Sequence, residues 1–240
     1  MLATRVENSR LETTELADWN EHFGGAPPHL LIGWAAERWG EQLAFTCSFG
    51  GAAGMVLLDI IASVAPGTPV LYIDTGLLFP ETYRLIAQVH ERYGITPRPV
   101  RPAHTLAEQA EVEGAALWER NPDRCCGLRK VQPLADVLAP FDAWITGIRR
   151  EGSSTRANVQ LLEWSSKYNL VKLNPLAFWS ERELWRYIYK HDVPYNPLLD
   201  QGYPSLGCYT CTRLPTGEDP RSGRWAGFTK TECGIHVETH

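Results

Sequence analysis

Residues 43–54 have the sequence LAFTCSFGGAAG and are followed directly by the apolar stretch Met55–Val64. The first six residues have the composition of a buried strand, and the apolar stretch is typical of a helix. Between them, Ser48 and Gly50 open a glycine-rich loop whose backbone N–H groups, at a helix N-terminus, can hold an anion. The loop matches neither G-x-G-x-x-G nor Walker A, because no Gly-Lys-Ser/Thr follows. A phosphate site and a plain tight turn therefore both remain open.

Strands and helices alternate along the rest of the chain. Helical patterns follow at 80–93 and 180–191, and short β-rich runs occur at residues 70–74, 97–101, 143–147 and 170–173. This alternation predicts an α/β fold in which helices flank a parallel sheet. Asp74-Thr75-Gly76 and Gly147-Ile148-Arg149 end two of the strands. The carboxyl edge of an open α/β sheet is where ligands bind, although a polar strand end also begins an ordinary helix.

Three segments are expected from the composition. Residues 1–40 form a helical N-terminal segment, residues 41–201 an α/β nucleotide-binding domain, and residues 202–240 a C-terminal extension. Eight of the 26 residues from Gly202 to Gly227 are Gly or Pro, which favours loops over a second packed domain. For the acidic N-terminal segment, we expect either packing on the α/β domain or self-association. A homo-oligomer is therefore one possible state of the protein.

The charge is unevenly distributed over the 240 residues. The net charge of −5 argues against general nucleic-acid binding. Residues 1–120 carry 8 basic and 15 acidic side chains, whereas residues 121–240 carry 15 and 13. No run approaches the ~18 apolar residues of a membrane span, and the polar first twenty residues argue against a secretory signal. We therefore expect a cytoplasmic protein without membrane contact, whose second half can receive an anion.

Six cysteines are too few for a disulfide scaffold, but their grouping is informative. C-x-x-C spacing is common in zinc sites and in iron–sulfur clusters, and two cysteine pairs 81 residues apart would tie the extension to the α/β domain. The spacing leaves zinc and a cluster as close competitors, with unligated thiols third. Cys47 lies inside a predicted strand and is expected in the core. The paired cysteines are Cys125, Cys126, Cys208 and Cys211.

Basic residues lie next to glycines, cysteines and strand ends in the second half. Arginine matches phosphate or sulfate with two parallel hydrogen bonds, and lysine provides a point charge. Isolated surface arginines are usually only solvated, but this grouping favours an anionic substrate. The residues are Arg129, Lys130, Arg149, Arg150, Arg156, Arg213, Arg221, Arg224 and Lys230.

Cys233 stands apart from the other cysteines, near the end of the chain. Lys230 lies three residues before it and His236 three residues after it, and both can stabilise a thiolate. Cys233 is therefore a candidate nucleophile, with an incidental terminal cysteine as the alternative.

These motifs together resemble the assimilatory adenylyl-sulfate reductases of the iron–sulfur type, in the PP-loop superfamily of nucleotide-binding proteins. The resemblance runs from about Leu43 to His236, although no acidic residue stands near Ala52, where the family pattern has one. The matching stretches are CCGLRKV (125–131), GIRRE (147–151), GCYTCTR (207–213), GEDPRSGRW (217–225) and ECGIH (232–236).

The resemblance implies a Rossmann-like PP-loop fold of the adenine nucleotide alpha hydrolase type. It also implies reduction of adenylyl sulfate to sulfite and AMP, in sulfate assimilation and cysteine biosynthesis. The Cys233 thiolate would attack the sulfate sulfur and form S-sulfocysteine, with Lys130 and His236 as further catalytic residues. The substrate would contact Ser48, Gly50, Asp74, Thr75, Gly76, Phe79, Arg129, Lys130, Arg149, Arg221 and Arg224.

The resemblance further assigns one 4Fe-4S cluster to Cys125, Cys126, Cys208 and Cys211. Reduced thioredoxin or glutaredoxin would be the electron donor. The sequence ends four residues after His236 without a fused redox domain, so we expect a separate donor protein.

Three alternatives remain at this point. A phosphoadenylyl-sulfate reductase would share the fold and the tail, but such reductases lack the four cluster cysteines. A PP-loop ATP pyrophosphatase or sulfurtransferase would use ATP and magnesium and would leave Cys233 unexplained. A nucleotide-sensing zinc or iron–sulfur protein would have no catalytic use for Cys233.

Overall fold

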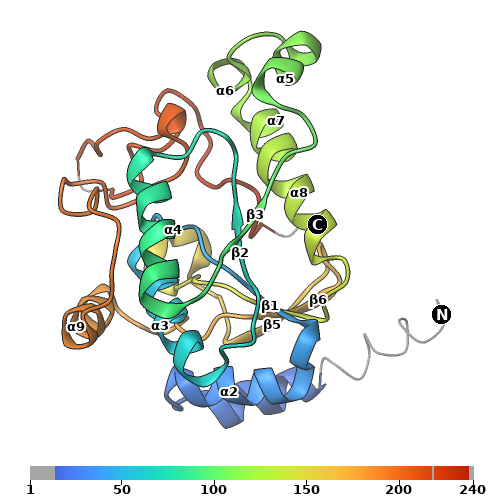
Figure 1. Cartoon of the computed structure of the whole chain (residues 1–240), viewed down its shortest axis with the longest axis vertical. Coiled ribbons are helices and arrows are strands. Elements are labelled where there is room, and N and C mark those ends of the chain that lie inside the picture. Colours follow the sequence, from blue (N-terminus) through green and yellow to red (C-terminus); the bar gives the residue numbers. More distant parts are fainter. Residues whose placement is uncertain (1–13, 218, 238–240) are drawn as a thin grey trace, which may run out of the picture.

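The computed structural model describes residues 14–217 and 219–237, and its centre is a six-stranded sheet (Figure 1). The strand order is β3-β2-β1-β4-β6-β5. All neighbouring pairs are parallel except β5 and β6, which are antiparallel. The strands are β1 (Leu43–Thr46), β2 (Val70–Ile73), β3 (Arg98–Val100), β4 (Ala143–Ile145), β5 (Leu162–Ser165) and β6 (Leu170–Leu173).

Residues 14–23 are helical, and eight further α-helices follow in the described part of the chain. A π-helix at Gly127–Val131 continues directly from α7. The helices are α2 (Pro28–Trp39), α3 (Ala52–Val64), α4 (Pro80–Tyr93), α5 (Leu106–Glu113), α6 (Leu117–Arg120), α7 (Pro122–Cys126), α8 (Gln132–Leu138) and α9 (Glu181–His191). Within the described residues, no helix has both the length and the apolar character needed to cross a membrane.

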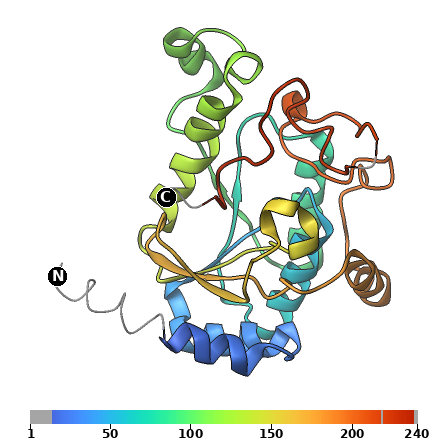
Figure 2. The ribbon, with the colours of Figure 1, turned by 180° about the vertical axis from the view of Figure 1, so that it is seen from behind.

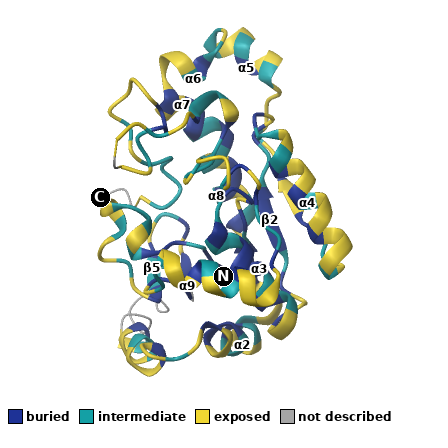
Figure 3. Cartoon of the chain, turned by 90° about the vertical axis from the view of Figure 1, so that its left-hand side faces the viewer, coloured by how far each residue is buried: buried dark blue, intermediate teal, exposed yellow. Residues whose placement is uncertain are grey.

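Alternate residues of each strand pack on opposite faces of the sheet, as the pleat requires. Phe45 of β1 belongs to the larger core, which is closed by α2, α3, α4 and α9. Its neighbour Ala44 faces the smaller core, together with Trp144 of β4 and Leu134 of α8. The central strands are therefore buried on both sides, and Figure 3 shows β2 and α3 in dark blue while α4 and α5 present exposed outer faces.

The structure confirms the α/β class and each strand expected from the sequence. The helix expected at 80–93 matches α4, and the capping box of Ser180 and Glu183 begins α9 as its sequence predicts. Two features were not anticipated. β5 is an antiparallel edge strand of four residues, and α5–α7 form an arm between β3 and α8.

The extension, residues 202–237, crosses the carboxyl edge of the sheet and returns toward α8. Tyr209 N–H donates to the Leu77 carbonyl (2.9 Å), and a β-bridge joins Leu78 to Cys208. A second bridge joins Thr212 to Arg224 and folds the extension onto itself. Figure 2 shows its last part, the tail (residues 228–237), running between the α5–α7 arm and the rest of the extension.

The core predicts a large effect for Phe45→Ala. Phe45 is fully buried in the central strand, so removing its ring leaves a cavity between the sheet and α3. We expect the free energy of unfolding to fall by about 3–5 kcal/mol in urea denaturation. Val112→Ala is the control, because Val112 is 77% exposed and exposed substitutions usually change stability by less than about 0.5 kcal/mol. Equal losses of stability in the two variants would contradict the buried position of Phe45 between the sheet and α3.

Candidate active site

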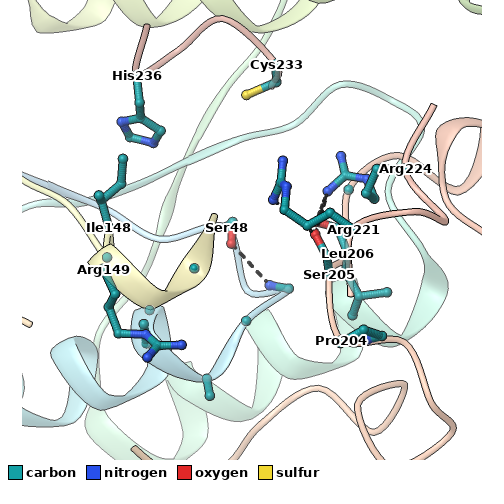
Figure 4. A pocket seen from close by; sticks show the side chains of 18 of the residues that line it. Ser48, Ile148, Arg149, Pro204, Ser205, Leu206, Arg221, Arg224, Cys233 and His236 are labelled. Atoms are coloured by element: carbon teal, nitrogen blue, oxygen red, sulfur yellow. Dashed lines mark hydrogen bonds between the residues drawn. The ribbon is translucent and has the colours of Figure 1, made fainter. Parts of the chain in front are cut away.

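A cavity of about 870 Å³ lies at the carboxyl edge of the sheet. The glycine loop after β1, the segment after β4, and the extension with its tail line it. In Figure 4, Ser48 and Arg149 come from the two strand ends, and Arg221 and Arg224 approach from the extension. The Cys233 sulfur and the His236 ring face the same space from the tail (Figure 4). Two strand ends, the extension and its tail therefore meet at one site.

The glycine loop positions the N-terminus of α3 at this cavity. Gly50 N–H donates to the Ser48 hydroxyl (3.4 Å), and Gly51 stands just before the helix. A Cβ atom on Gly147 would lie 3.3 Å from the backbone nitrogen of Gly54, so glycine at this position allows the loop after β4 to approach the helix closely. Backbone N–H groups and the positive end of the helix dipole thus face the cavity, as anion binding requires. The position of this loop at the cavity supports the interpretation of residues 48–54 as a phosphate site.

Two arginines of the extension bring positive charge to the cavity. The Ser205 hydroxyl accepts from Arg221 (3.3 Å) and from Arg224 (3.1 Å), and the Leu206 carbonyl accepts from Arg224 as well (3.1 Å). The Arg224 guanidinium also lies 4.5 Å from the centre of the Trp225 ring. These contacts hold both side chains at the cavity wall.

Several buried nitrogens at the cavity have no hydrogen-bond partner within the described residues. Such groups are costly to bury, so an unpartnered set at one cavity indicates a ligand that supplies acceptors. The backbone of Trp225 is also left-handed, with φ of +48°, and such strain is typical of functional sites. The atoms are Nε of Arg221, Nε of Arg224, Nε1 of Trp225 and Nδ1 of His236.

The charged residues around the cavity leave it net positive. Five cations and three carboxylates of the described chain line it. Arg149 donates to Glu181, to Glu151 (3.4 Å) and to the Trp179 carbonyl (2.8 Å), so its charge is largely balanced. The other lining cations, Lys130, Arg156, Arg221 and Arg224, face one lining carboxylate, Glu232, so this part of the described wall carries three excess positive charges and the whole lining carries two.

Lys130 lies between the cavity and the paired cysteines, on the π-helix that follows Cys126. Burial lowers the pKa of an ammonium group, but here the nearby thiols of Cys208, Cys233 and Cys126 outweigh burial, and the pKa of Lys130 is raised. Lys130 is therefore a permanent cation close to Cys233. The π-helical turn, a feature that is frequent at functional sites, sets its direction.

His236 anchors the end of the tail on the sheet. Its ring stacks on Trp144 of β4, with centroids 5.3 Å apart and planes within 9°. Burial holds the pKa of His236 well below its ordinary value, and Lys172, Arg156 and Lys167 lower this pKa further. The imidazole is therefore neutral at pH 7 and serves as a hydrogen-bonding group.

The four paired cysteines line one small cavity on the other side of Lys130. Burial raises the pKa of Cys125 to about 12, and the neighbouring thiols of Cys126, Cys208 and Cys211 raise this pKa as well. The Thr75 hydroxyl lies 3.3 Å from the Cys208 sulfur. The donor set consists of thiols alone, which suits an iron–sulfur cluster or zinc. Within residues 14–217 and 219–237, however, no three potential ligands converge on one metal ion.

The remaining predicted substrate contacts fall into two groups. Thr75, Ser48 and Gly50 line the large cavity. The described lining does not include Asp74, Gly76, Phe79 or Arg129. Asp74 accepts from the Tyr83 hydroxyl (2.7 Å), and Phe79 contacts the rings of Tyr203 and Tyr209.

Arg129 points into the protein and not into the large cavity. Its guanidinium donates to the Thr75 carbonyl (2.7 Å), the Gln109 side chain (3.0 Å) and the His104 carbonyl (3.3 Å). These bonds tie the end of β2 to the α5–α7 arm. Arg129 and Gly76 therefore shape the strand end beside the cavity.

Three further residues reach the cavity although the sequence did not single them out as site residues: Arg156, Glu232 and Trp225. Arg156 stood in the basic cluster, and Glu232 and Trp225 lie in the matching motifs. Arg156 and Glu232 lie 76 residues apart, so their pairing had no local signal in the sequence.

The fold and the cavity define a class: α/β proteins with a PP-loop-like anion site beneath a cysteine-bearing tail. The model of the phosphoadenosine phosphosulfate reductase domain matches residues 42–214, and the chain belongs to this family. An adenosine 5'-phosphosulfate reductase from Salinibacter ruber is 47% identical over 94% of this chain and 90% of its own length. A protein of the same name from Shouchella clausii is 45% identical over 96% of both chains. The family inferred from the motifs is thereby confirmed.

Solved structures agree with this assignment. The phosphoadenylyl-sulfate reductase from Candida auris, crystallised as a phosphate complex, has a TM-score of 0.70 at 31% identity over 80% of this chain and 93% of its own. An FMN adenylyltransferase from Candida glabrata has a TM-score of 0.55 at 18% identity, covering 81% of this chain and 67% of its own. The second likeness shows the fold alone.

Gly207→Ala tests the position of Arg224. An added Cβ atom would lie 2.2 Å from the Arg224 guanidinium, so that side chain must leave Ser205 and the cavity wall. We expect affinity for inorganic pyrophosphate, a multiply charged anionic probe, to fall roughly tenfold in titration calorimetry, as loss of one charge-assisted bond implies. Gly33→Ala in α2, where the Cβ meets nothing within 4 Å, should bind like the parent. Unchanged affinity of the Gly207 variant would contradict this role.

Proposed function

We propose that the protein reduces adenylyl sulfate to sulfite and AMP. The observation that carries the proposal is the placement of the Cys233 thiol over a cavity with unpartnered buried donors and excess positive charge. A phosphosulfate group bears two negative charges, and the described lining has a net charge of +2. The names of the curated relatives support the same substrate.

The reaction has two covalent steps. The Cys233 thiolate attacks the sulfate sulfur, the sulfur–oxygen bond breaks with its electron pair on AMP, and S-sulfocysteine remains. A thiolate of a reduced dithiol protein then attacks the Cys233 sulfur and expels sulfite, which leaves a mixed disulfide. The second donor thiol resolves that bond, so the donor is oxidised to a disulfide, two protons are released, and Cys233 is regenerated. Thioredoxin or glutaredoxin has the required chemistry.

The fixed cations stabilise the charge that develops on AMP. Lys130, Arg221 and Arg224 hold the phosphosulfate, and the Trp225 and His236 ring nitrogens lie among the unpartnered groups that can donate to it. The neutral His236 imidazole donates a hydrogen bond without repelling the cations. Ser48, Gly50 and Thr75 contact the nucleotide, with Asp74, Gly76 and Phe79 around that strand end.

Arg129 and Arg149 contribute indirectly. The bonds of Arg129 to the Thr75 carbonyl and to the arm fix the strand end on which the nucleotide rests. Arg149 is balanced by Glu151 and Glu181, so it shapes the wall without adding net charge.

The charge of the cavity favours adenylyl sulfate over its 3'-phosphorylated form. A 3'-phosphate adds about two negative charges at neutral pH, which the excess of two positive charges would leave unbalanced. An ATP pyrophosphatase shares the fold but gives no role to Cys233. ATP pyrophosphatase activity is therefore the second candidate function, and the experiment below distinguishes it from reduction of adenylyl sulfate.

We further propose that Cys125, Cys126, Cys208 and Cys211 hold a 4Fe-4S cluster. The all-thiol donor set and its shared cavity support this assignment. A cluster held by these four cysteines would supply negative charge near Lys130 and would tune the local field. Lys130 then lies between this group and the substrate anion, and it holds its proton throughout.

The covalent intermediate provides the test of the proposed function. Incubation with adenylyl sulfate, without any reductant, should raise the mass of the intact protein by one SO3 group, and Cys233→Ala should show no gain. Subsequent addition of dithiothreitol should remove the added mass and release sulfite. ATP with magnesium serves as the control substrate. Absence of the added mass in the parent protein, or turnover of ATP instead, would overturn the proposal.

The cluster assignment predicts the behaviour of Cys126→Ser. The parent should contain about four iron atoms per chain and absorb visible light, and loss of one thiolate ligand should lower both. Cys47→Ala is the matched control, because Cys47 is buried away from the four cysteines and should leave the iron content unchanged. Iron and zinc analysis measures both variants. A full iron content in the Cys126 variant, or zinc in the parent, would contradict the assignment.

A further inference from the structure

The carboxylate of Glu232, the residue before Cys233, lies between two arginines of the cavity. Arg156 donates to it through Nε (3.0 Å) and Nη2 (2.9 Å), each to a different oxygen. Arg221 donates to it through Nη2 (3.2 Å), and the Thr155 hydroxyl adds a fourth bond (3.2 Å). The Glu232 side chain is only 9% exposed. A carboxylate with this many charge-assisted bonds is firmly fixed.

Glu232 belongs to the tail, whereas its partners belong to the rest of the site. Arg156 lies after β4, and Arg221 lies in the earlier part of the extension. On the other side of Cys233, Lys167 donates to the Gly234 carbonyl and Tyr168 donates to the Ile235 carbonyl (2.9 Å). The nucleophile is thus held on both sides. The partners of Glu232, Arg156 and Arg221, are cations that line the cavity.

We propose that Glu232 is a positioning residue that latches the tail closed and places the Cys233 thiol over the substrate site. This inference rests on the proposed function for its chemistry. Two guanidinium groups face one carboxylate, so the latch keeps one positive charge for the substrate anion. Arg221 also keeps its buried Nε without a partner in the described chain. Arg221 therefore holds the tail and also lines the part of the wall proposed to bind the substrate.

The two covalent steps make opposite demands on this latch. Attack on the sulfate sulfur requires the thiol at a fixed place, and a displacement of about 1 Å can cost roughly a hundredfold in rate. Release of sulfite requires the dithiol of another protein to reach the Cys233 sulfur, so the tail must open. Weakening the latch should therefore slow the first step and leave the second step as fast or faster.

Glu232→Gln tests the latch, because glutamine keeps the size of the side chain but removes its charge. Three rates are measured: alkylation of Cys233 by iodoacetamide without substrate, gain of the SO3 mass with adenylyl sulfate, and loss of that mass with dithiothreitol. We expect alkylation to be about tenfold faster, mass gain 10–100-fold slower, and mass loss not slower. Glu91→Gln, on the exposed side of α4, is the matched control and should match the parent in all three.

Arg156→Gln is the second variant, because it removes the other half of the same pair. It should also expose Cys233 to alkylation. The double variant Glu232→Gln/Arg156→Gln should be alkylated at about the same rate as either single variant. Glu232→Asp keeps the charge and should recover part of the rate of mass gain. Unfolding temperature and iron content, equal to those of the parent, exclude general damage.

The outcomes separate this inference from the proposed function. If the parent gains no SO3 mass, the proposed function fails, and the alkylation rates still decide whether Glu232 closes the tail. If the parent gains the mass while Glu232→Gln alkylates and reacts at parental rates, the latch is overturned. Additive effects of Glu232→Gln and Arg156→Gln on alkylation would overturn it as well.

Discussion

The site depends on a short backbone connection between the extension and the sheet edge. Tyr209 N–H donates to the Leu77 carbonyl, and the β-bridge between Leu78 and Cys208 runs beside it. The extension is rich in Gly and Pro and has little apolar surface to bury, so it cannot fold by hydrophobic packing alone. This connection fixes its path across the carboxyl edge and brings Arg221, Arg224 and the tail above the strand ends.

The second constraint is electrostatic. Burying cations without partners is unfavourable, and the described cavity contains two more positive than negative charges. Coulombic interaction with the sulfurs of Cys208, Cys233 and Cys126 favours the charged form of Lys130, and Arg221 of the extension pairs with Glu232. An anionic ligand completes the balance.

The sequence was sufficient for the fold but only for part of the site. Apolar runs such as 43–47 and 143–147 are strong signals because both faces of these strands are buried. β5 has four residues at an edge, too short for a periodic pattern. The motif match located Cys233, Lys130 and the four paired cysteines. It could not show that Arg129 turns inward or that Glu232 pairs with Arg156, 76 residues away, because both facts depend on packing between distant segments.

In the proposed reaction, a tail that carries the Cys233 thiol can meet two demands that a rigid wall would not. The thiol must close over a small substrate in the first step, and the same sulfur must become accessible to a dithiol protein in the second. Hydrophobic anchoring of the tail would make opening slow, because apolar surface would be exposed to water. The arginines that pair with Glu232 line the cavity, so they can exchange its carboxylate for the substrate or product anion without exposing apolar surface. Polar contacts hold Glu232, Gly234 and Ile235 in the described tail, while the stacking of His236 on Trp144 and the packing of Ile235 against the smaller core add apolar contacts at its end.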